Sequence, residues 1–227
     1  MSREFIYIKL SGPTASYRLP TAISGTQLAL EAPPYSSLLG MLSYASGREI
    51  TPKDTRIGYR YTYTGQGMDL ETNHRWKRNP TGTYSYDSDT NIRKRQIHYN
   101  ITLELLLDNL DLFNEIRHPS RQMTFGRSQD LATLEYVRRV NAEEVESGEL
   151  WGTLLPLEQG KDIPSDGMFY NLPEYFNYDD GKIRRARSIR LFLALDQYKS
   201  EVSCPNLWKI SDEEEINPVF YLHSWEN

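Results

Sequence analysis

Apolar and polar residues alternate most regularly between residues 97 and 107, where apolar side chains occupy every second position. Such alternation predicts a strand with one buried face. Residues 5–10 form a short apolar run that Ser11-Gly12-Pro13 ends, which predicts a second, buried strand. His98 falls among the polar positions of the first strand, so we expect its side chain to face solvent.

A third alternating stretch, residues 56–64, places Tyr59, Tyr61 and Tyr63 on one face. Three aromatic rings in a row can stack on unpaired bases, as in single-strand RNA readers. Aromatic side chains are also frequent on the buried face of a sheet, where they pack well on the pleated surface. The sequence leaves both interpretations open, with burial the more common outcome.

Pro33-Pro34 opens a predicted helix, because the fixed φ angle of proline suits the first helical turn. Apolar residues follow at helical spacing as far as Ala45, and Gly47 is the expected stop. Ser36 and Ser37 lie at the helix start, where free backbone N–H groups can hold a phosphate. Ordinary N-capping is the more common explanation for serines at this position.

The order of the predicted elements indicates the fold class. Asp108 is placed to cap a second, short helix that Pro119 ends. A β-like stretch follows over residues 131–140, although its apolar spacing also fits a helix. With the arm described below, the order is β, α, β, arm, β, α and β, the split βαβ pattern. We therefore expect an α+β fold with a ferredoxin-like (RRM-like) βαββαβ domain over residues 1–140.

The composition changes after residue 140, and residues 141–227 predict a β-rich C-terminal extension packed on this domain. Four glutamates between 143 and 149 predict an acidic bend, and residues 160–182 have the composition of irregular loops. Alternation over residues 188–195 predicts another strand, and residues 219–221 predict a last one. Four basic residues precede residue 188 and form either a second phosphate contact or the partner of an acidic surface: Lys182, Arg184, Arg185 and Arg187.

Residues 74–99 predict a β-hairpin arm that projects from the body. The middle of this stretch is rich in turn formers and poor in aliphatic side chains, so it buries little. Its stems are basic and also carry Trp76, Tyr84, Tyr86 and Tyr99. Cationic groups neutralise phosphates and aromatic faces stack on unpaired bases, so the arm is a candidate RNA or DNA contact. A solvated hairpin whose charges only maintain solubility has the same pattern.

Charge is distributed unevenly along the chain, whose formal net charge is −5. Residues 1–100 carry 13 Lys and Arg against 8 Asp and Glu, a net of +5, whereas residues 101–227 carry 13 against 23, a net of −10. The arm has six basic residues against Asp87 and Asp89. A local field of this kind can bind a polyanion despite distant acids. The overall acidity argues against nonspecific coating of nucleic acid and favours a local, shaped site.

Composition excludes several classes of protein. A chain of 227 residues with 38% hydrophobic residues suits one globular domain, and no run approaches the ~20 apolar residues of a membrane span. The start lacks a signal-peptide pattern, and Cys204 is the only cysteine, so we expect a reducing cytoplasm. The histidines lack metal-ligand spacing and no nucleotide-binding loop occurs, so we expect no metal or other cofactor.

One enzymatic alternative survives these exclusions. Metal-independent RNA cleavage needs a base for the 2′-hydroxyl, an acid for the leaving group and a cation for the phosphorane. Tyr44, Lys94 and His98 supply these groups if the fold brings them together.

Three segments of the sequence resemble motifs of the CRISPR-associated Cas-five family. Residues 11–18, SGPTASYR, resemble its GP-x-ASFR segment after the first strand. Residues 32–42, APPYSSLLGML, resemble its PP-x-S-x-x-x-G-x-L helix start, and residues 126–131, GRSQDL, resemble its GRS-x-DL turn. The segments occur in the family's order over most of residues 3–140, and the chain resembles the subtype I-B form most.

The resemblance implies a subunit of a type I Cascade surveillance complex, in the repeat-associated RNA-binding superfamily, that caps the 5′ handle of the guide RNA. The arm is then a thumb-like hairpin over the handle and the first backbone subunit. Another surface meets the large subunit, so target DNA is contacted only indirectly. Members of subtype I-C also cut precursor RNA with a Tyr, Lys and His set in which Lys and His are adjacent. This chain has no adjacent Lys-His pair, so we expect that it is not an enzyme. The resemblance then implies that a separate enzyme processes the precursor RNA.

The expected RNA-binding residues lie in the first loop, the first helix, the arm and the GRS turn: Gly12, Ser16, Tyr17, Arg18, Ser36, His74, Arg75, Trp76, Lys77, Arg78, Arg93, Lys94, Arg95, Gly126, Arg127 and Ser128. Two other functions stay open. One is a metal-independent endoribonuclease that processes precursor CRISPR RNA. The other is a β-rich interaction subunit whose basic arm binds an acidic partner protein.

Overall fold

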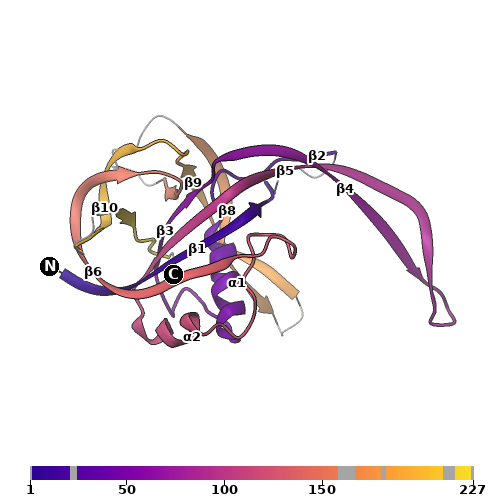
Figure 1. Ribbon diagram of the computed structural model, residues 1–227, viewed down its shortest axis with the longest axis horizontal. Coiled ribbons are helices and arrows are strands. Elements are labelled where there is room, and N and C mark those ends of the chain that lie inside the picture. Colours follow the sequence, from indigo (N-terminus) through magenta and orange to yellow (C-terminus); the bar gives the residue numbers. More distant parts are fainter. Residues whose placement is uncertain (1, 21–24, 158–166, 180–182, 212–217, 226–227) are drawn as a thin grey trace.

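The computed structural model describes residues 2–20, 25–157, 167–179, 183–211 and 218–225. Figure 1 shows a body made mainly of strands, from which one long hairpin projects. The elements in chain order are β1 Ser2–Ala15, β2 Thr26–Gln27, α1 Tyr35–Ser46, β3 Ile57–Thr62, β4 Gly65–Arg78, β5 Tyr84–Leu107, the 3₁₀ turn η1 Leu110–Leu112, α2 Phe113–Arg117, β6 Thr133–Leu150, β7 Leu154–Pro156, β8 Met168–Asp179, β9 Ile183–Ala194, β10 Ser200–Ile210 and β11 Val219–Tyr221.

The main sheet is organised around β5. Strand β1 lies between β5 and β6, and β3 pairs with the other side of β5, so four antiparallel strands have the order β6-β1-β5-β3. Strands β10 and β11 extend the sheet beyond β6, and an isolated bridge joins Ile57 to His223. A second sheet has the order β7-β9-β8. The predicted α+β class, with a mostly antiparallel sheet, is confirmed.

Both faces of the first half of β1 are buried. Ile6 and Ile8 belong to the larger core, which includes the apolar faces of α1 and α2. Phe5 and Tyr7 belong to a second core, where the Phe5 ring lies 4.9 Å from the Trp208 ring of β10. Burial on both faces explains why residues 5–8 are continuously apolar and do not alternate. No helix in the described part of the chain is long and apolar enough to cross a membrane.

Helix α1 begins and ends as its sequence predicts. Pro34 is the N-cap residue with extended backbone angles, and Gly47 ends the helix at φ 73°, in the left-handed region that favours glycine. No side chain caps the N-terminus by a hydrogen bond, so the N-capping explanation for Ser36 and Ser37 is wrong. The first turn also carries no acidic residue.

The tyrosines of β3 form part of the core and are not a stacking platform. Tyr59 and Tyr61 are fully buried, and the Tyr59 hydroxyl donates to the Pro33 carbonyl oxygen at 2.8 Å. Tyr63, just beyond β3, is half-buried and donates its hydroxyl to the Glu31 carboxylate at 2.6 Å. Burial of these rings is therefore the correct interpretation of the pattern.

The expectation that His98 faces solvent is wrong, because Asn100 interrupts the alternation of β5. Asn100 has a φ of 53°, and the side chains on its N-terminal side exchange faces relative to a regular strand. His98 is consequently 0% exposed. Its Nδ1 lies 2.9 Å from the Tyr61 hydroxyl, and its ring stacks on Tyr63 with centroids 3.9 Å apart.

Three local predictions are also corrected. Asn109, not Asp108, caps the short helical segment, because Asp108 accepts hydrogen bonds from Arg56 instead. The expected acidic bend is the continuous second half of β6, which pairs with β10. Much of the expected loop region 160–182 is β8, held by its ladder with β9, while residues 160–166 and 180–182 lie outside the described residues.

His98 makes the folded state sensitive to acid. Burial of the imidazole lowers its pKa from 6.5 to about 4, so between pH 6.5 and about pH 4 the unfolded chain binds a proton that the folded chain does not. Stability is therefore lost as the pH falls from 6.5 to about 4, by up to about 3 kcal/mol from this group. Urea unfolding at pH 7.5 and pH 5 will measure the loss. His98→Asn, which keeps a hydrogen-bond acceptor but does not titrate, will show a smaller loss; equal losses would contradict this assignment.

Candidate nucleic-acid interface

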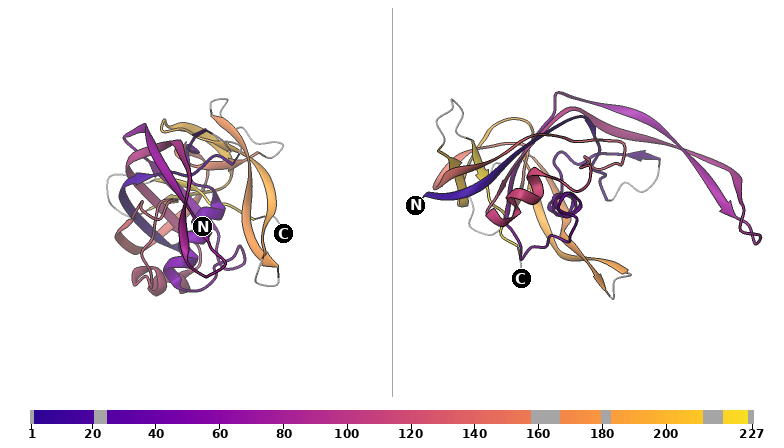
Figure 2. Two further views of the ribbon diagram at one scale, coloured as in Figure 1. Left: turned by 90° about the vertical axis from the view of Figure 1, so that its right-hand side faces the viewer. Right: turned by 60° about the horizontal axis from the view of Figure 1, so that its bottom comes forward.

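The arm is a two-stranded hairpin of β4 and the first part of β5, and it extends clear of the body in Figure 1 and in the right-hand view of Figure 2. It begins at Gly65, earlier than the expected His74. The tip closes through hydrogen bonds between Asn79 and Thr83, and Gly82 adopts a φ of 83°. The pairing register shifts between Asn73 and Arg75, which locally breaks the ladder of this two-stranded segment.

The pairing register separates the distal arm into two faces. Trp76 pairs with Tyr86 and Arg78 pairs with Tyr84, so these four side chains share one face. The rings are open to solvent, with exposed fractions of 65% for Trp76, 66% for Tyr84 and 47% for Tyr86. His74 joins the aromatic set through a 3.0 Å contact between its Nδ1 and the Tyr86 hydroxyl.

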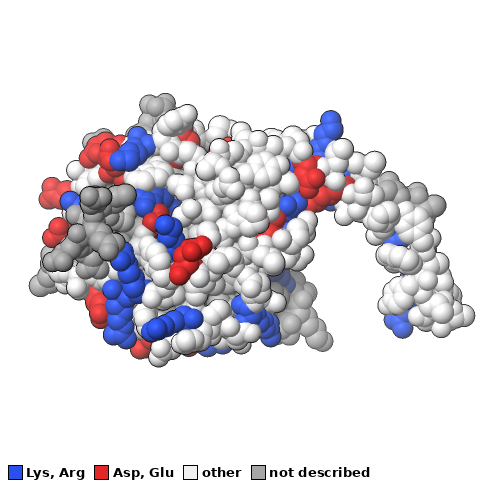
Figure 3. Space-filling view, in the orientation of Figure 1, with Lys and Arg blue, Asp and Glu red and all other residues white. Residues whose placement is uncertain are grey.

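Arg75 and Lys77 lie on the opposite face of the distal arm, since they alternate with Trp76 and Arg78 along β4. All three distal cations are exposed, and none forms an ion pair with another residue that the structure describes. On the face shown in Figure 3, the described atoms of the outer arm include basic but no acidic side chains. The described side chains of the distal arm thus offer exposed cations and open aromatic faces together.

Ion pairs neutralise Arg95 and Arg127 at the arm base. Arg95 Nε lies 2.7 Å from the Glu71 carboxylate, and Arg127 lies 2.7 Å from both Glu71 and Asp130. Burial alone would raise the pKa of the Glu71 carboxyl, but hydrogen bonds from Arg127 and Arg95 hold it below its usual range. The hydrogen bond to Asp130 is the main cause that raises the pKa of Arg127. Two of the expected RNA-binding residues, Arg95 and Arg127, therefore fasten the arm to the GRS turn.

The first loop and the GRS turn pack against each other. A Cβ at Gly12 would meet the Leu131 carbonyl oxygen at 2.7 Å, and a Cβ at Gly126 would meet the Ser16 carbonyl oxygen at 2.5 Å. Ser16 is buried and donates its hydroxyl to the Gln96 carbonyl oxygen at 2.9 Å. Tyr17 is 5% exposed and packs edge-on against Tyr61. Gly12, Ser16, Tyr17 and Gly126 therefore hold the two loops together through packing and hydrogen bonds within the fold.

Several expected residues do remain at the surface. Arg18, at the end of the first loop, and Ser128, in the GRS turn, are exposed. In the arm, Lys94 is exposed and pairs with Leu70, whereas Arg93 is half-buried and pairs with Glu71. The structure therefore divides the expected RNA-binding residues into accessible side chains and side chains that hold the loops together.

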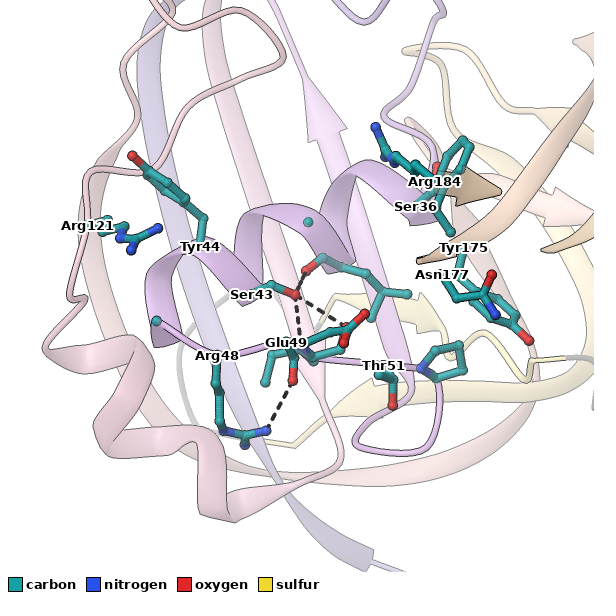
Figure 4. Close-up of a pocket in the computed structure, with 16 residues that line it drawn as sticks. Ser36, Ser43, Tyr44, Arg48, Glu49, Thr51, Arg121, Tyr175, Asn177 and Arg184 are labelled. Carbon is teal, nitrogen blue, oxygen red and sulfur yellow. Dashed lines mark hydrogen bonds between the residues drawn. The ribbon is translucent and has the colours of Figure 1, made fainter. Parts of the chain in front are cut away.

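Two adjoining pockets run along the exposed side of α1, with volumes of about 480 and 520 Å³. Ser36, Gly40, Tyr44 and Arg184 line both pockets, and we call this combined surface the α1 groove. Figure 4 shows Ser36 and Arg184 toward one end of the first pocket and Tyr44 with Arg121 at the other. The Arg121 guanidinium lies 5.1 Å from the Tyr44 ring centroid.

Sequence reasoning identified only part of the α1 groove. Ser36 was expected from the helix start, and Arg184 belongs to the basic lead-in of the expected strand at residue 188. Arg121 has no signal in the sequence, because only the packing of its loop beside α1 brings it to Tyr44. Lys182 of the same lead-in lies outside the described residues.

The groups expected for RNA cleavage have different environments. His98 is buried between Tyr61 and Tyr63, while Lys94 is exposed on the arm and Tyr44 is exposed on α1. Desolvation lowers the pKa of His98 to about 4, which disfavours its protonated form near neutral pH. A general acid or base must reach the reacting proton directly or through one water, and the closed His98 site offers no such access.

No protein-family model matches the sequence, and no curated protein is similar to it in sequence. Solved structures, however, share the fold. A chain of a CRISPR RNA-guided surveillance complex is 17% identical with a TM-score of 0.53, over 88% of this chain and 91% of that one. A CRISPR protein from Archaeoglobus fulgidus is 10% identical with a TM-score of 0.50, over 97% and 100%. A chain of a type III-B Cmr-beta complex bound to cognate target RNA is 14% identical with a TM-score of 0.53, over 86% of each chain. The chain is thus similar in fold to components of CRISPR complexes.

Proposed function

We propose that this chain is a non-catalytic subunit of a type I CRISPR Cascade surveillance complex that binds and caps the 5′ handle of the guide RNA. The observation that carries the proposal is the distal arm, where three exposed cations and open aromatic rings project from a fold similar to those of CRISPR-complex chains. The strand order β6-β1-β5-β3 with α1 and α2 supports the ferredoxin-like arrangement in this proposal.

The arm geometry suits single-stranded RNA. Phosphates can approach Arg75 and Lys77 on one face, while unpaired bases stack on Trp76, Tyr84 or Tyr86 on the other. Neither contact depends on the identity of a base, so the arm would hold an RNA segment by its backbone and by ring stacking. The remaining surfaces are then available to the backbone and large subunits, in a cytoplasmic ribonucleoprotein.

The buried environment of His98 supports a positional role without RNA cleavage. In this proposal a separate enzyme processes the precursor RNA. Purification of the tagged chain from its native host tests the assignment: a discrete short RNA with a constant 5′ end should copurify together with other subunits. A protein complex without RNA would instead favour an arm that binds an acidic partner. RNA trimmed by the chain alone in EDTA would indicate a nuclease.

The charge of the arm sets the salt dependence of binding. We expect the triple variant Arg75→Ala, Lys77→Ala, Arg78→Ala to reduce the magnitude of the slope of log K against log salt by about 2, at about 0.7 per phosphate of a single strand. Fluorescence anisotropy with a short labelled single-stranded RNA measures this slope. The matched control removes three exposed cations from the body through Lys53→Ala, Arg117→Ala and Lys199→Ala. Equal slopes in both triple variants would move the RNA site away from the arm.

The aromatic face makes a separate prediction. Trp76→Ala should weaken RNA binding by about 1–3 kcal/mol while leaving the salt slope unchanged, because it removes stacking and no charge. Trp76→Phe should retain most of the affinity. The control Tyr198→Ala removes a ring that is 79% exposed on the body. The same anisotropy titration compares the four proteins, and unaltered affinity in Trp76→Ala would show that no base stacks there.

A further inference from the structure

The α1 groove has the features of an anion site. The second pocket includes Ser36, Ser37 and Arg184 but no Asp or Glu among its described lining residues. The first pocket is lined by Arg48, Arg121 and Arg184 against a single acid, Glu49. Arg48 is already paired with Glu115 at 3.2 Å, which leaves Arg121 and Arg184 as the cations of the groove.

The first turn of α1 adds donors to this surface. No side chain caps the N-terminus and no carboxylate lies in the first turn, so the positive end of the helix dipole is not compensated locally. Ser36 is a second and independent observation. The residue is only 8% exposed, it lines both pockets, and no described residue forms a hydrogen bond with its hydroxyl. A hydroxyl that lines a pocket without a protein partner can bind a ligand or water there.

The shape of the groove allows a ligand to reach the helix backbone. Gly40 has no heavy atom of a neighbouring segment within 4 Å of the position of a Cβ. The Arg184 guanidinium is held 3.9 Å from the Phe176 ring centroid at the Ser36 end. Tyr44 is 48% exposed two helical turns away, about 12 Å along the axis. One end of the groove therefore carries protein groups that can bind a phosphate, and the other end carries an exposed aromatic ring.

We propose that the α1 groove binds a phosphate group of the bound RNA through the first turn of α1, the Ser36 hydroxyl and Arg184. The neighbouring nucleoside extends along the helix past Gly40 toward Tyr44. This inference rests on the proposed RNA-binding function and adds a second contact, on the body, to the one on the arm. The phosphate is either an internal phosphodiester or the 5′-terminal phosphate of the RNA.

A charge placed in the first turn tests the inference. We expect Ser37→Asp to weaken binding of a short labelled single-stranded RNA by about tenfold or more, because its carboxylate repels the phosphate. Ser37→Asn has nearly the same shape without the charge and should bind as the unaltered chain does. An acidic residue in the first turn favours the helix itself, so thermal unfolding should show no loss of stability in Ser37→Asp.

Arg184→Gln provides a second measurement, and we expect it to reduce the magnitude of the salt slope by about 0.7. Titrations with 5′-hydroxyl and 5′-phosphate forms of the same RNA distinguish the two sources of phosphate. A terminal phosphate makes the effect of Ser37→Asp appear only with the 5′-phosphate form, whereas an internal phosphodiester makes it equal in both.

The two levels of the proposal fail in different ways. If Ser37→Asp and Ser37→Asn bind equally and Arg184→Gln keeps the full salt slope, while the arm triple variant flattens it, the groove inference is wrong and the RNA-binding function stands. If the unaltered chain binds neither RNA, both are wrong.

Discussion

The backbone ladder of β5 is the constraint on which the rest of the structure depends. From Leu107 to Thr102 this strand pairs with β1 on one side and β3 on the other, and its apolar side chains are fixed in the core. The same strand continues into the arm, where beyond His98 its described partners are β4 and a two-residue contact with β2. A two-stranded ribbon has little independent stability, so the direction of the arm is inherited from the core segment of β5.

Ion pairs also fix the direction of the arm at the point where the core ends. Glu71 of β4 lies between Arg95 of β5 and Arg127 of the GRS turn, while Asp130 accepts from both Arg127 and Thr14. A partly buried network of this kind fixes the geometry of the groups it joins. The basic residues of the chain therefore have two different tasks. Arg95 and Arg127 near the arm base are neutralised and structural, whereas the basic side chains beyond the register shift, at residues 75, 77 and 78, are exposed.

The acidic part of the chain lies on the body. Glu143, Glu144, Glu146 and Glu149 project from the second half of β6, which pairs with β10, while the arm belongs to the opposite end of the sheet order. Separation of the two signs discourages a polyanion from the β6 end and leaves the arm and the α1 groove accessible to it. The negative net charge and a nucleic-acid partner are compatible for this reason.

Local sequence determined the elements whose signals are local. The Pro34 start and Gly47 stop of α1, and the alternation that predicts strand β3, needed no information from the rest of the chain. The failures came from single residues or from partners distant in sequence. Asn100 adopts a left-handed backbone conformation, which reverses the face on which His98 lies. The neighbouring residues in the sequence do not predict this conformation. Strand β8 contains the turn-prone pair Asn171 and Pro173, and only its ladder with β9 keeps it extended.

The candidate site shows the same division. Open side chains of the arm, such as Trp76 and Lys77, were predictable because their composition allows no burial. The structural use of Arg127 was not, since its partners Glu71 and Asp130 meet only in the folded chain. Arg121 and Arg184 reach the α1 groove from separate segments, and no spacing in the sequence connects them.

The turn and distal strands of the arm, residues 75–86, bury no side chain in this chain. Substitutions there change what the arm contacts without removing any packing from the core, so selection for a stable fold places few demands on them. Evolution can therefore remodel the tip for a new binding partner, while Glu71, Arg95 and Arg127 preserve the direction in which the arm projects. The residues that determine the fold and the residues that determine what the arm contacts are therefore different, and they can change independently.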